Sequence, residues 1–465
     1  MPPRFYTPPP VAHRLVALVV EAAGGRLPDG PVLEPSVGAG ALVLAWLDHA
    51  AGPVTDPDAA GRAADLVRTR LRALDADPEA VAATRRALQL RCAPHLPPDD
   101  PALSRVRVGD GWSAPAELAA VILANPPWGS YSGRQAGRAG APGDGPRPSG
   151  VTTGWPAYHT RAVLGLLEHL RADGVAGFVL PGQVATLRGY GAFRRALAAR
   201  VRHVEHLGEG AFPGIESPAC LVIVGPAGPG PLQVRRGGHV ESIPREALTA
   251  DPVRPWLSRL EDRFAAWPPP GFVLSPAAFG DVGLHSGNAA STLFSRHPFP
   301  GAQPVLEGRD VRPFVVGAPR LWFDPRAVPA PGQYFHVAHW ERSRAMPIVL
   351  RQTAPRPVAA LNPGVAFRNS VLGCRGVPGL ETTTVVALLN SEALARVYAA
   401  LSPDACQRTF PQVKVGDLAR LPWPASPESR KRLESMLRSG GFDAVARVAS
   451  DVYAPVLDGA GSGEP

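Results

Sequence analysis

The four residues 125–128 (NPPW) are the part of the sequence best suited to chemistry. They follow an apolar run, residues 118–124 (LAAVILA), of the kind found in buried parallel strands, and ligands bind at the carboxyl ends of such strands. The amide oxygen of Asn125 and a neighbouring main-chain carbonyl could both accept hydrogen bonds from one exocyclic amino group, which would localise the nitrogen lone pair. Two prolines stiffen the turn, and Trp128 offers a flat face for the ring that bears the amine. The motif predicts a catalytic turn that acts on an amino nitrogen; a chance proline turn is the alternative.

A second turn carries an acid and two glycines. Glu34 ends a short strand pattern and is followed by residues 35–40 (PSVGAG), after which a helical pattern begins. Gly38 and Gly40 would let the backbone approach a nucleoside closely. The spacing is not GxGxxG, so this turn by itself is weaker evidence than the NPPW motif.

Two aspartates end further strand patterns. Asp75 closes the run 69–75, where a carboxylate can hold both hydroxyls of a ribose; a helix cap is the alternative. Asp110 follows the run 106–109 and could accept a hydrogen bond from an adenine amine, although turn formation also favours aspartate. With Glu34, the two residues predict a nucleoside site at one edge of a sheet.

Elements that would position these residues alternate regularly between residues 31 and 224. Strand patterns cover 31–34, 69–75, 106–109, 118–124, 175–180, 201–206 and 219–224, and helical patterns cover 41–50, 78–90, 158–171 and 190–200. Such alternation predicts a doubly wound, Rossmann-like α/β sheet. Residues 130–156 are rich in Gly, Pro, Arg and Ser and lack periodicity, so we expect a flexible insertion there.

Beyond residue 225 the alternation stops, after a linker pattern (GPAGPGP). We predict a first domain over 1–225, a second, mixed and β-rich domain over 226–424, and a C-terminal helix with a disordered tail over 425–465. In the second domain 21 basic residues outnumber 14 acidic ones. That surplus favours a polyanionic partner.

Composition limits the class of protein. The 465 residues are 45% hydrophobic and 19% charged, with a formal net charge of +8, as expected for a folded chain with many turns. The four cysteines form no CxxC pair, so we expect neither a zinc site, nor any other metal site, nor a disulfide framework. No signal-peptide pattern and no run of about 18 apolar residues occurs. We therefore expect a cytoplasmic protein without a membrane span.

The order of these motifs resembles the γ-class (TaqI-type) N6-adenine DNA methyltransferases of bacterial restriction–modification systems. The resemblance begins at residues 5–9 (FYTPP), passes through the turns described above and continues to residues 212–215 (FPGI). It implies the fold of an S-adenosylmethionine-dependent methyltransferase and S-adenosyl-L-methionine as cofactor. The cofactor-binding residues it implies are Tyr6, Thr7 and Glu34 at the methionine end, Gly38 and Gly40 in the turn, Asp75 at the ribose and Asp110 at the adenine.

The same resemblance implies a site for a base flipped out of duplex DNA. Asn125 and the Pro126 carbonyl would hold the target amine, and Trp128 and Phe212 would stack on either side of the adenine. The family usually has Tyr or Phe where Trp128 stands. Phe212 taken alone would be interpreted as a core aromatic. Its place before the apolar run 219–224 is the reason for assigning it as the second stacking ring.

The second domain resembles the family's target-recognition half. Residues 306–314 (LEGRDVRPF), 348–353, 388–391 and 410–415 carry this weaker part of the resemblance. The DNA-binding candidates are Arg309, Arg312, Arg351 and Lys414. Arg134, Arg138 and Arg147 in the insertion are further candidates, against a solvated insertion as the alternative.

The resemblance implies direct methyl transfer from the cofactor to adenine N6 in double-stranded DNA by a monomer. A restriction endonuclease, if one exists, would be a separate chain. Two alternatives stay open. One is a methyltransferase on an rRNA base or a protein glutamine amide, and the other is a catalytically inactive DNA-binding relative.

Overall fold

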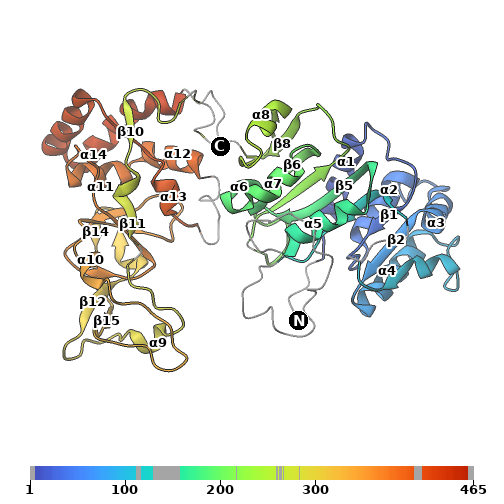
Figure 1. Ribbon diagram of the computed structural model, residues 1–465, viewed down its shortest axis with the longest axis horizontal. Coiled ribbons are helices and arrows are strands. Elements are labelled where there is room, and N and C mark those ends of the chain that lie inside the picture. The colour runs from blue at the N-terminus through green and yellow to red at the C-terminus, as the bar shows by residue number, and fades with distance from the viewer. Residues whose placement is uncertain are drawn as a thin grey trace. The chain divides into compact units, whose positions relative to one another are not determined.

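The computed structural model describes residues 6–111, 117–128, 158–215, 217–257, 266–281, 283–402 and 411–458, together with Leu260 and Phe264. The chain divides into two units, Met1–Leu257 and Ser258–Pro465, which are described separately (Figure 1). The predicted insertion at 130–156, Phe5 and the last seven residues, 459–465, lie outside the described residues.

The first unit is built on one nine-stranded sheet with the order β3-β2-β1-β4-β5-β7-β6-β8-β9. Strands β1 to β5 run parallel, β7 is antiparallel to both of its neighbours, and β8 pairs parallel with β6 and antiparallel with β9. The strands are β1 (Val32–Glu34), β2 (Leu71–Asp75), β3 (Val106–Val108), β4 (Ala119–Ala124), β5 (Leu170–Pro181), β6 (Val201–Gly208), β7 (Ala219–Val224), β8 (Leu232–Arg236) and β9 (His239–Ile243). This topology confirms the predicted doubly wound sheet.

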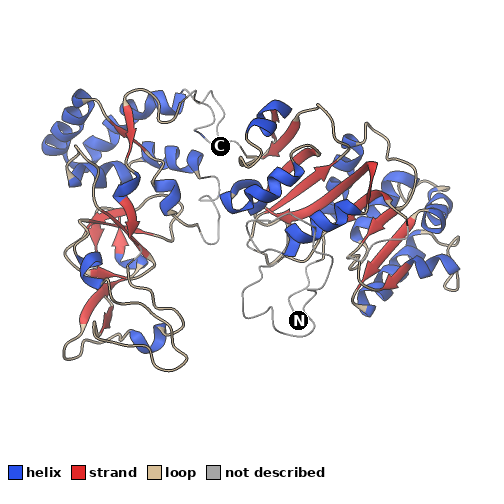
Figure 2. Ribbon diagram, viewed as in Figure 1, coloured by secondary structure: helices blue, strands red, loops and turns tan. Residues whose placement is uncertain are grey.

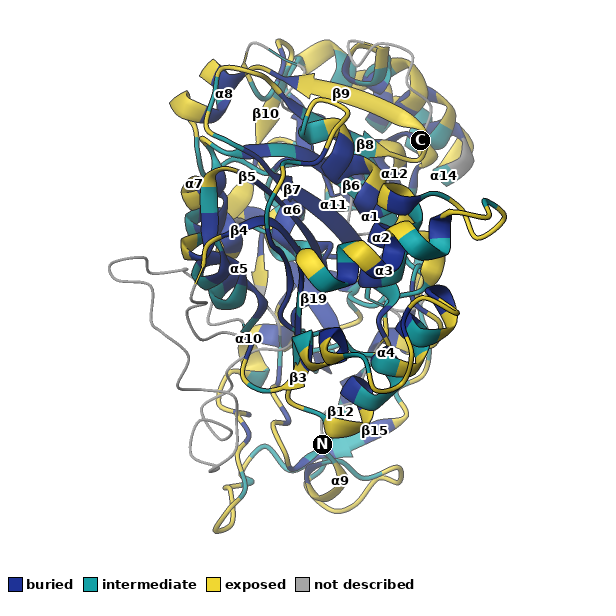
Figure 3. Ribbon diagram, turned by 90° about the vertical axis from the view of Figure 1, so that its right-hand side faces the viewer, coloured by how far each residue is buried: buried dark blue, intermediate teal, exposed yellow. Residues whose placement is uncertain are grey.

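Helices cover both faces of this sheet, as Figures 2 and 3 show. One face carries α1 (Pro9–Ala22), α2 (Ala41–Ala51), α3 (Ala59–Thr69) and α4 (Pro78–Arg91), and the other carries α5 (Tyr158–Glu168), α6 (Gln183–Thr186), α7 (Gly191–Leu197) and α8 (Arg245–Ala250). Because successive strand residues point to opposite faces, Val121 and Leu123 join the first core, whereas Ile122 and Ala124 join the second. All six residues of β4 are therefore buried, which explains the uninterrupted apolar run.

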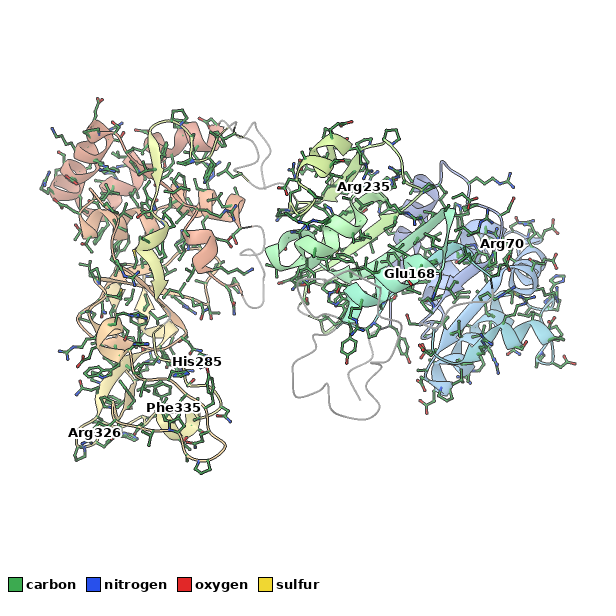
Figure 4. All side chains as sticks on the ribbon, viewed as in Figure 1. Arg70, Glu168, Arg235, His285, Arg326 and Phe335 are labelled. Atoms are coloured by element: carbon green, nitrogen blue, oxygen red, sulfur yellow. The ribbon has the colours of Figure 1, made fainter. Side chains whose placement is uncertain are left out.

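The first unit extends beyond the boundary that we predicted at residue 225. Strands β8 and β9 lie in the segment assigned to the second domain, yet they complete the sheet, and the unit ends at Leu257. The Gly- and Pro-rich stretch before β8 is held by the Arg202 guanidinium, which donates to the carbonyls of Pro226, Gly228 and Gly230. Arg235 on β8 (labelled in Figure 4) forms an ion pair with Glu21 of α1 at 2.7 Å. This stretch, which has the composition of a linker, is therefore an ordered turn.

The second unit combines small sheets with a helical part. Its main sheet has the order β11-β19-β16-β17, a three-stranded sheet has the order β15-β12-β18, and two-stranded sheets join β10 to β20 and β13 to β14. The strands are β10 (Phe272–Leu274), β11 (Phe279–Asp281), β12 (Gln303–Leu306), β13 (Val311–Arg312), β14 (Val315–Val316), β15 (Leu321–Phe323), β16 (Ile348–Arg351), β17 (Ala359–Leu361), β18 (Ala366–Phe367), β19 (Val371–Cys374) and β20 (Pro422–Pro424). The helices are α9 (Ala290–Leu293), α10 (Trp340–Arg344), α11 (Thr382–Asn390), α12 (Glu392–Leu401), α13 (Val415–Leu418) and α14 (Pro427–Asp458).

The helix predicted for the C-terminal segment is present, but it belongs to the second unit. Helix α14 changes direction at Gly441, whose φ is 65°. It packs on α11 and α12 and buries Leu433, Val445 and Tyr453 in their shared core. No single helix of the described residues is long and apolar enough to cross a membrane; α11 and α12 pass that test only when taken together as a pair bent by 69°.

Candidate active site

The carboxyl ends of β1, β2, β3 and β4 lie side by side, because these strands are parallel neighbours in the sheet. The chain passes from β1 outward to β2 and β3 and then returns to β4 on the other side of β1. This reversal is a topological switch point, where open α/β sheets bind ligands. Glu34, Asp75 and Asn125 are the residues that the structure brings to this edge, and Asp110 follows β3 two residues after its end.

Glu34 is a buried carboxyl group with one unused oxygen. Its exposed fraction is 2%, and its Oε2 atom has no hydrogen-bond partner. Burial raises the pKa of Glu34 well above its usual range, the main-chain N–H of Val43 in α2 opposes that rise, and the nearby Asp75 adds to it. A buried polar atom without a partner carries a free-energy cost, so this oxygen fits a ligand that brings a donor or a positive charge.

The glycine turn after β1 is fixed from both sides. The Gly38 N–H donates to Asp75 Oδ2 at 2.8 Å, and Thr84 Oγ1 donates to the Gly38 carbonyl at 2.8 Å. Gly38 has a φ of 54°, and a Cβ there would lie 2.9 Å from Cδ1 of Tyr6. The Tyr6 ring, half exposed, therefore packs on the turn at a place where only glycine fits. Gly40, with φ 87°, is the N-cap residue of α2.

Asp75 connects this turn to the next one. Its Oδ2 accepts from Gly38 and its Oδ1 accepts from the Asp77 N–H at 2.9 Å. The alternative considered for Asp75, a helix cap, is taken by Asp77, whose Oδ1 accepts from the Glu79 N–H at the start of α4. A carboxylate has about four acceptor positions, so Asp75 retains acceptor capacity for ligand hydroxyls.

Asp110 lies on an exposed turn beside the β1 loop. The Gly109 N–H donates to the Asp75 carbonyl at 3.0 Å. A Cβ at Gly111 would lie 1.9 Å from the Pro35 carbonyl oxygen. The loops after β1, β2 and β3 therefore touch one another, and the three predicted acids border one region.

Asn125 is held by two residues from distant parts of the sequence. Its Nδ2 donates to Thr7 Oγ1 at 3.1 Å, and its main-chain carbonyl accepts from Ser36 Oγ at 3.3 Å. The following Pro126 is buried. Ser36 is a site residue that sequence reasoning missed. Its place in the turn between Glu34 and Gly38 was the available signal, but a serine in a turn has many local uses.

The rings of Trp128 and Phe212 are in contact, but they do not lie parallel with a gap between them. Their ring centroids are 5.4 Å apart and their planes cross at 65°, an edge-to-face contact. Trp128 Nε1 donates to the Val179 carbonyl at 3.3 Å, and Phe212 is 3% exposed. A ring stacked between two others needs about 7 Å between the outer planes, so the two rings must separate before a base can lie between them.

The DNA-binding candidates share one part of the second unit. The turn at 308–310 and β13, which carry Arg309 and Arg312, pack against β16, which ends at Arg351. The main chain just before Lys414 bonds to Gln352 through the Val413 N–H at 2.8 Å. Arg309 is exposed and paired with Glu307, and Arg312 is also exposed. Arg134, Arg138 and Arg147 lie outside the described residues.

Comparisons with known proteins concern the fold. No protein-family profile matches the chain, and no curated protein matches it by sequence. Among solved structures, the DrdV–DNA complex matches 93% of this chain and 57% of its own, with a TM-score of 0.50 and 11% identity. The M protein of the type I restriction enzyme EcoKI matches 50% of this chain and 48% of its own (TM-score 0.37, 15% identity). A modification subunit of a putative type I restriction enzyme from Vibrio vulnificus YJ016 matches 50% and 47% (TM-score 0.36, 18% identity).

The chain thus spans about half the length of the two type I subunits that it matches. The DrdV likeness covers nearly the whole of this chain, the part after the sheet included. The architecture predicted from the sequence is confirmed: an α/β, doubly wound sheet followed by a second, mixed unit rich in short strands.

Proposed function

We propose that this chain is a DNA methyltransferase that transfers a methyl group from S-adenosyl-L-methionine to N6 of an adenine flipped out of duplex DNA. The observation that carries the proposal is the placement of Asn125. Its amide follows a buried strand at the switch point of the sheet, is held through its nitrogen, and lies three residues from a ring that contacts Phe212.

The donor side has groups that fit the cofactor. S-adenosylmethionine supplies a methyl group on a positively charged sulfur atom. The unused oxygen of Glu34 would accept from the cofactor's ammonium group, Asp75 would accept from the ribose hydroxyls and Asp110 from the adenine amine. Tyr6, Gly38 and Gly40 would border the cofactor where the chain turns after β1. A cationic ligand also suits an acid whose charge burial disfavours.

On the acceptor side, the amide oxygen of Asn125 and the Pro126 carbonyl would accept from the two N6 hydrogens. These bonds keep the lone pair on nitrogen and aim it at the methyl carbon. The nitrogen–carbon bond would form as the carbon–sulfur bond breaks, S-adenosylhomocysteine would be the leaving group, and the released amine proton would pass to solvent. Trp128 and Phe212, once separated, would stack on the flipped adenine and offset the cost of extruding it from the duplex.

DNA as the substrate is supported by the second unit. The chain carries a net charge of +8, and Arg309, Arg312, Arg351 and Lys414 lie in one part of that unit. The DrdV structure, which this chain resembles over most of its length, is a complex with DNA. We propose that these four residues contact DNA and that the enzyme acts as a cytoplasmic monomer in a restriction–modification system, with a separate endonuclease chain.

The test is transfer of labelled methyl groups from S-adenosylmethionine to unmethylated genomic DNA, with ribosomal RNA and a cell-extract protein fraction as parallel acceptors. We expect label in N6-methyladenine of DNA, and none with Asn125→Ala. Calorimetric cofactor binding by that variant shows that its fold is intact. Label in RNA or in a protein amide would overturn the choice of substrate. Cofactor binding without transfer to any acceptor would favour a catalytically inactive DNA-binding relative.

A further inference from the structure

The two ends of the Asn125 side chain have opposite uses. Its oxygen accepts hydrogen bonds and its nitrogen only donates them. An amino group of a substrate can be held by the oxygen end, whereas the nitrogen end would present hydrogens to hydrogens. The terminal torsion of asparagine is broad and roughly two-fold, so the side chain needs an outside partner to select one orientation.

Thr7 is that partner in the structure. Asn125 Nδ2 donates to Thr7 Oγ1 at 3.1 Å, across 118 residues of sequence. Ser36 Oγ donates to the Asn125 main-chain carbonyl at 3.3 Å, across 89 residues. One contact fixes the side-chain amide and the other fixes the peptide group that leads into Pro126.

Thr7 is itself well anchored. It precedes Pro8 and Pro9, the N-cap and the first residue of α1, and proline restricts the backbone there. Helix α1 lies close on the sheet, because a Cβ at Gly177 of β5 would meet Val19 at 2.5 Å and Leu15 at 3.1 Å. A threonine on such a rigid start can hold a catalytic side chain in one orientation.

We propose that Thr7 and Ser36 are positioning residues for the transfer step: Thr7 holds the amide nitrogen of Asn125 so that the oxygen faces the target amine, and Ser36 holds its peptide group. This inference rests on the proposed function. It gives Thr7 a role on the acceptor side, which differs from the cofactor contact that the family resemblance implies.

The hydrogen bond can be tested without any substrate. The chain has only five asparagines, so a protein labelled with [15N]asparagine gives few side-chain amide signals, and Asn125→Ala assigns the relevant pair. We expect Thr7→Val to shift that pair and Thr7→Ser to leave it near its wild-type position. Thr249→Val is the matched control, since it removes an exposed threonine hydroxyl of α8 that donates to the Arg245 carbonyl, one turn earlier in the same helix. An unshifted pair in Thr7→Val overturns the positioning role.

The effect of these hydrogen bonds on the transfer rate is tested by measuring each variant beside the wild-type enzyme in the methyl-transfer assay. The loss of one net hydrogen bond corresponds to about a tenfold fall in rate. We expect that fall in kcat for Thr7→Val, a smaller fall for Ser36→Ala, and wild-type kcat for Thr7→Ser and Thr249→Val, with the cofactor Kd unchanged throughout. A rise in cofactor Kd with kcat restored at saturation would make Thr7 a cofactor residue and overturn the inference. If the wild type methylates no DNA, the proposed function fails, and the amide signals still decide whether Thr7 holds Asn125.

Discussion

The two sides of the candidate site differ in how ready they are to bind. On the donor side the turns after β1, β2 and β3 are joined by hydrogen bonds to the carboxylate and the main-chain carbonyl of Asp75, and Oε2 of Glu34 has no hydrogen-bond partner. On the acceptor side, Trp128 and Phe212, the rings proposed to stack on the base, contact each other. If the proposed function holds, the cofactor would meet a preformed site, whereas the base would first have to displace one aromatic ring from the other.

Loss of the Asn125 amide should have the largest effect, on kcat. Asn125→Ala removes the proposed acceptor for the target amine but leaves the donor-side turns in place. We expect kcat to fall about 100-fold or more, as for loss of one preorganised catalytic hydrogen bond, with little change in cofactor affinity. Single-turnover transfer and calorimetry measure the two quantities. A large loss of cofactor affinity instead would contradict the separation of the two sides.

On the donor side, Glu34→Gln should weaken cofactor binding by about tenfold or more, because a hydrogen bond between charged groups is replaced by a neutral one. Calorimetry measures the change in Kd. Since burial raises the pKa of Glu34, we also expect a proton to leave this carboxyl on binding, so that wild-type affinity rises with pH. Glu34→Gln should bind with much less pH dependence.

The same variant should stabilise the cofactor-free protein at high pH. The pKa of Glu34 is raised in the folded state above the reference value of 4.5. Below that value both states are protonated, and ionisation makes no difference to stability. As pH rises, the unfolded chain loses this proton first, so the wild type loses stability while Glu34→Gln does not. Thermal unfolding of both proteins at pH 5 and pH 8 should show a gap that widens with pH.

Loss of the Phe212 ring should have an intermediate effect, on DNA affinity. Phe212→Ala removes one stacking surface, worth about 1–3 kcal/mol per base, but it also removes the contact that a base must displace. We expect DNA affinity at the target site to fall by about tenfold or less, with cofactor affinity unchanged. Titration of DNA carrying 2-aminopurine at the target position follows extrusion by fluorescence. An unchanged fluorescence response would argue against Phe212 as a stacking ring.

Trp128→Phe should have the smallest effect. Phenylalanine keeps a stacking face and loses the bond from Nε1 to the Val179 carbonyl. That bond is long at 3.3 Å, and a net contribution of about 0.5 kcal/mol corresponds to roughly a twofold change in rate. Trp128→Ala, which loses the ring itself, is the comparison. Transfer rates of the two variants separate the effect of the Nε1 bond, which orients the ring, from the effect of stacking.

Local sequence determined the strands that carry the site. A fully apolar run identified β4 and therefore the position of Asn125, because a parallel strand buried on both faces admits only apolar side chains. The glycines of the β1 turn were also readable, since Gly38 and Gly40 adopt positive φ values that other residues avoid. The Gly- and Pro-rich stretch before β8 was wrongly predicted to be a linker, because its ordered structure depends on Arg202 and not on local propensity.

Tertiary structure alone decided how these pieces act together. The bonds to Asn125 come from Thr7 and Ser36, which are 118 and 89 residues away, and no local pattern links them. The edge-to-face contact of Trp128 with Phe212 likewise depends on how two distant loops pack. The sequence by itself determined which residues stand at strand ends, because that follows from hydrophobic periodicity. Which atoms face one another was decided only by the folded sheet, because hydrogen-bond partners and ring orientations are set by packing between segments far apart in the chain.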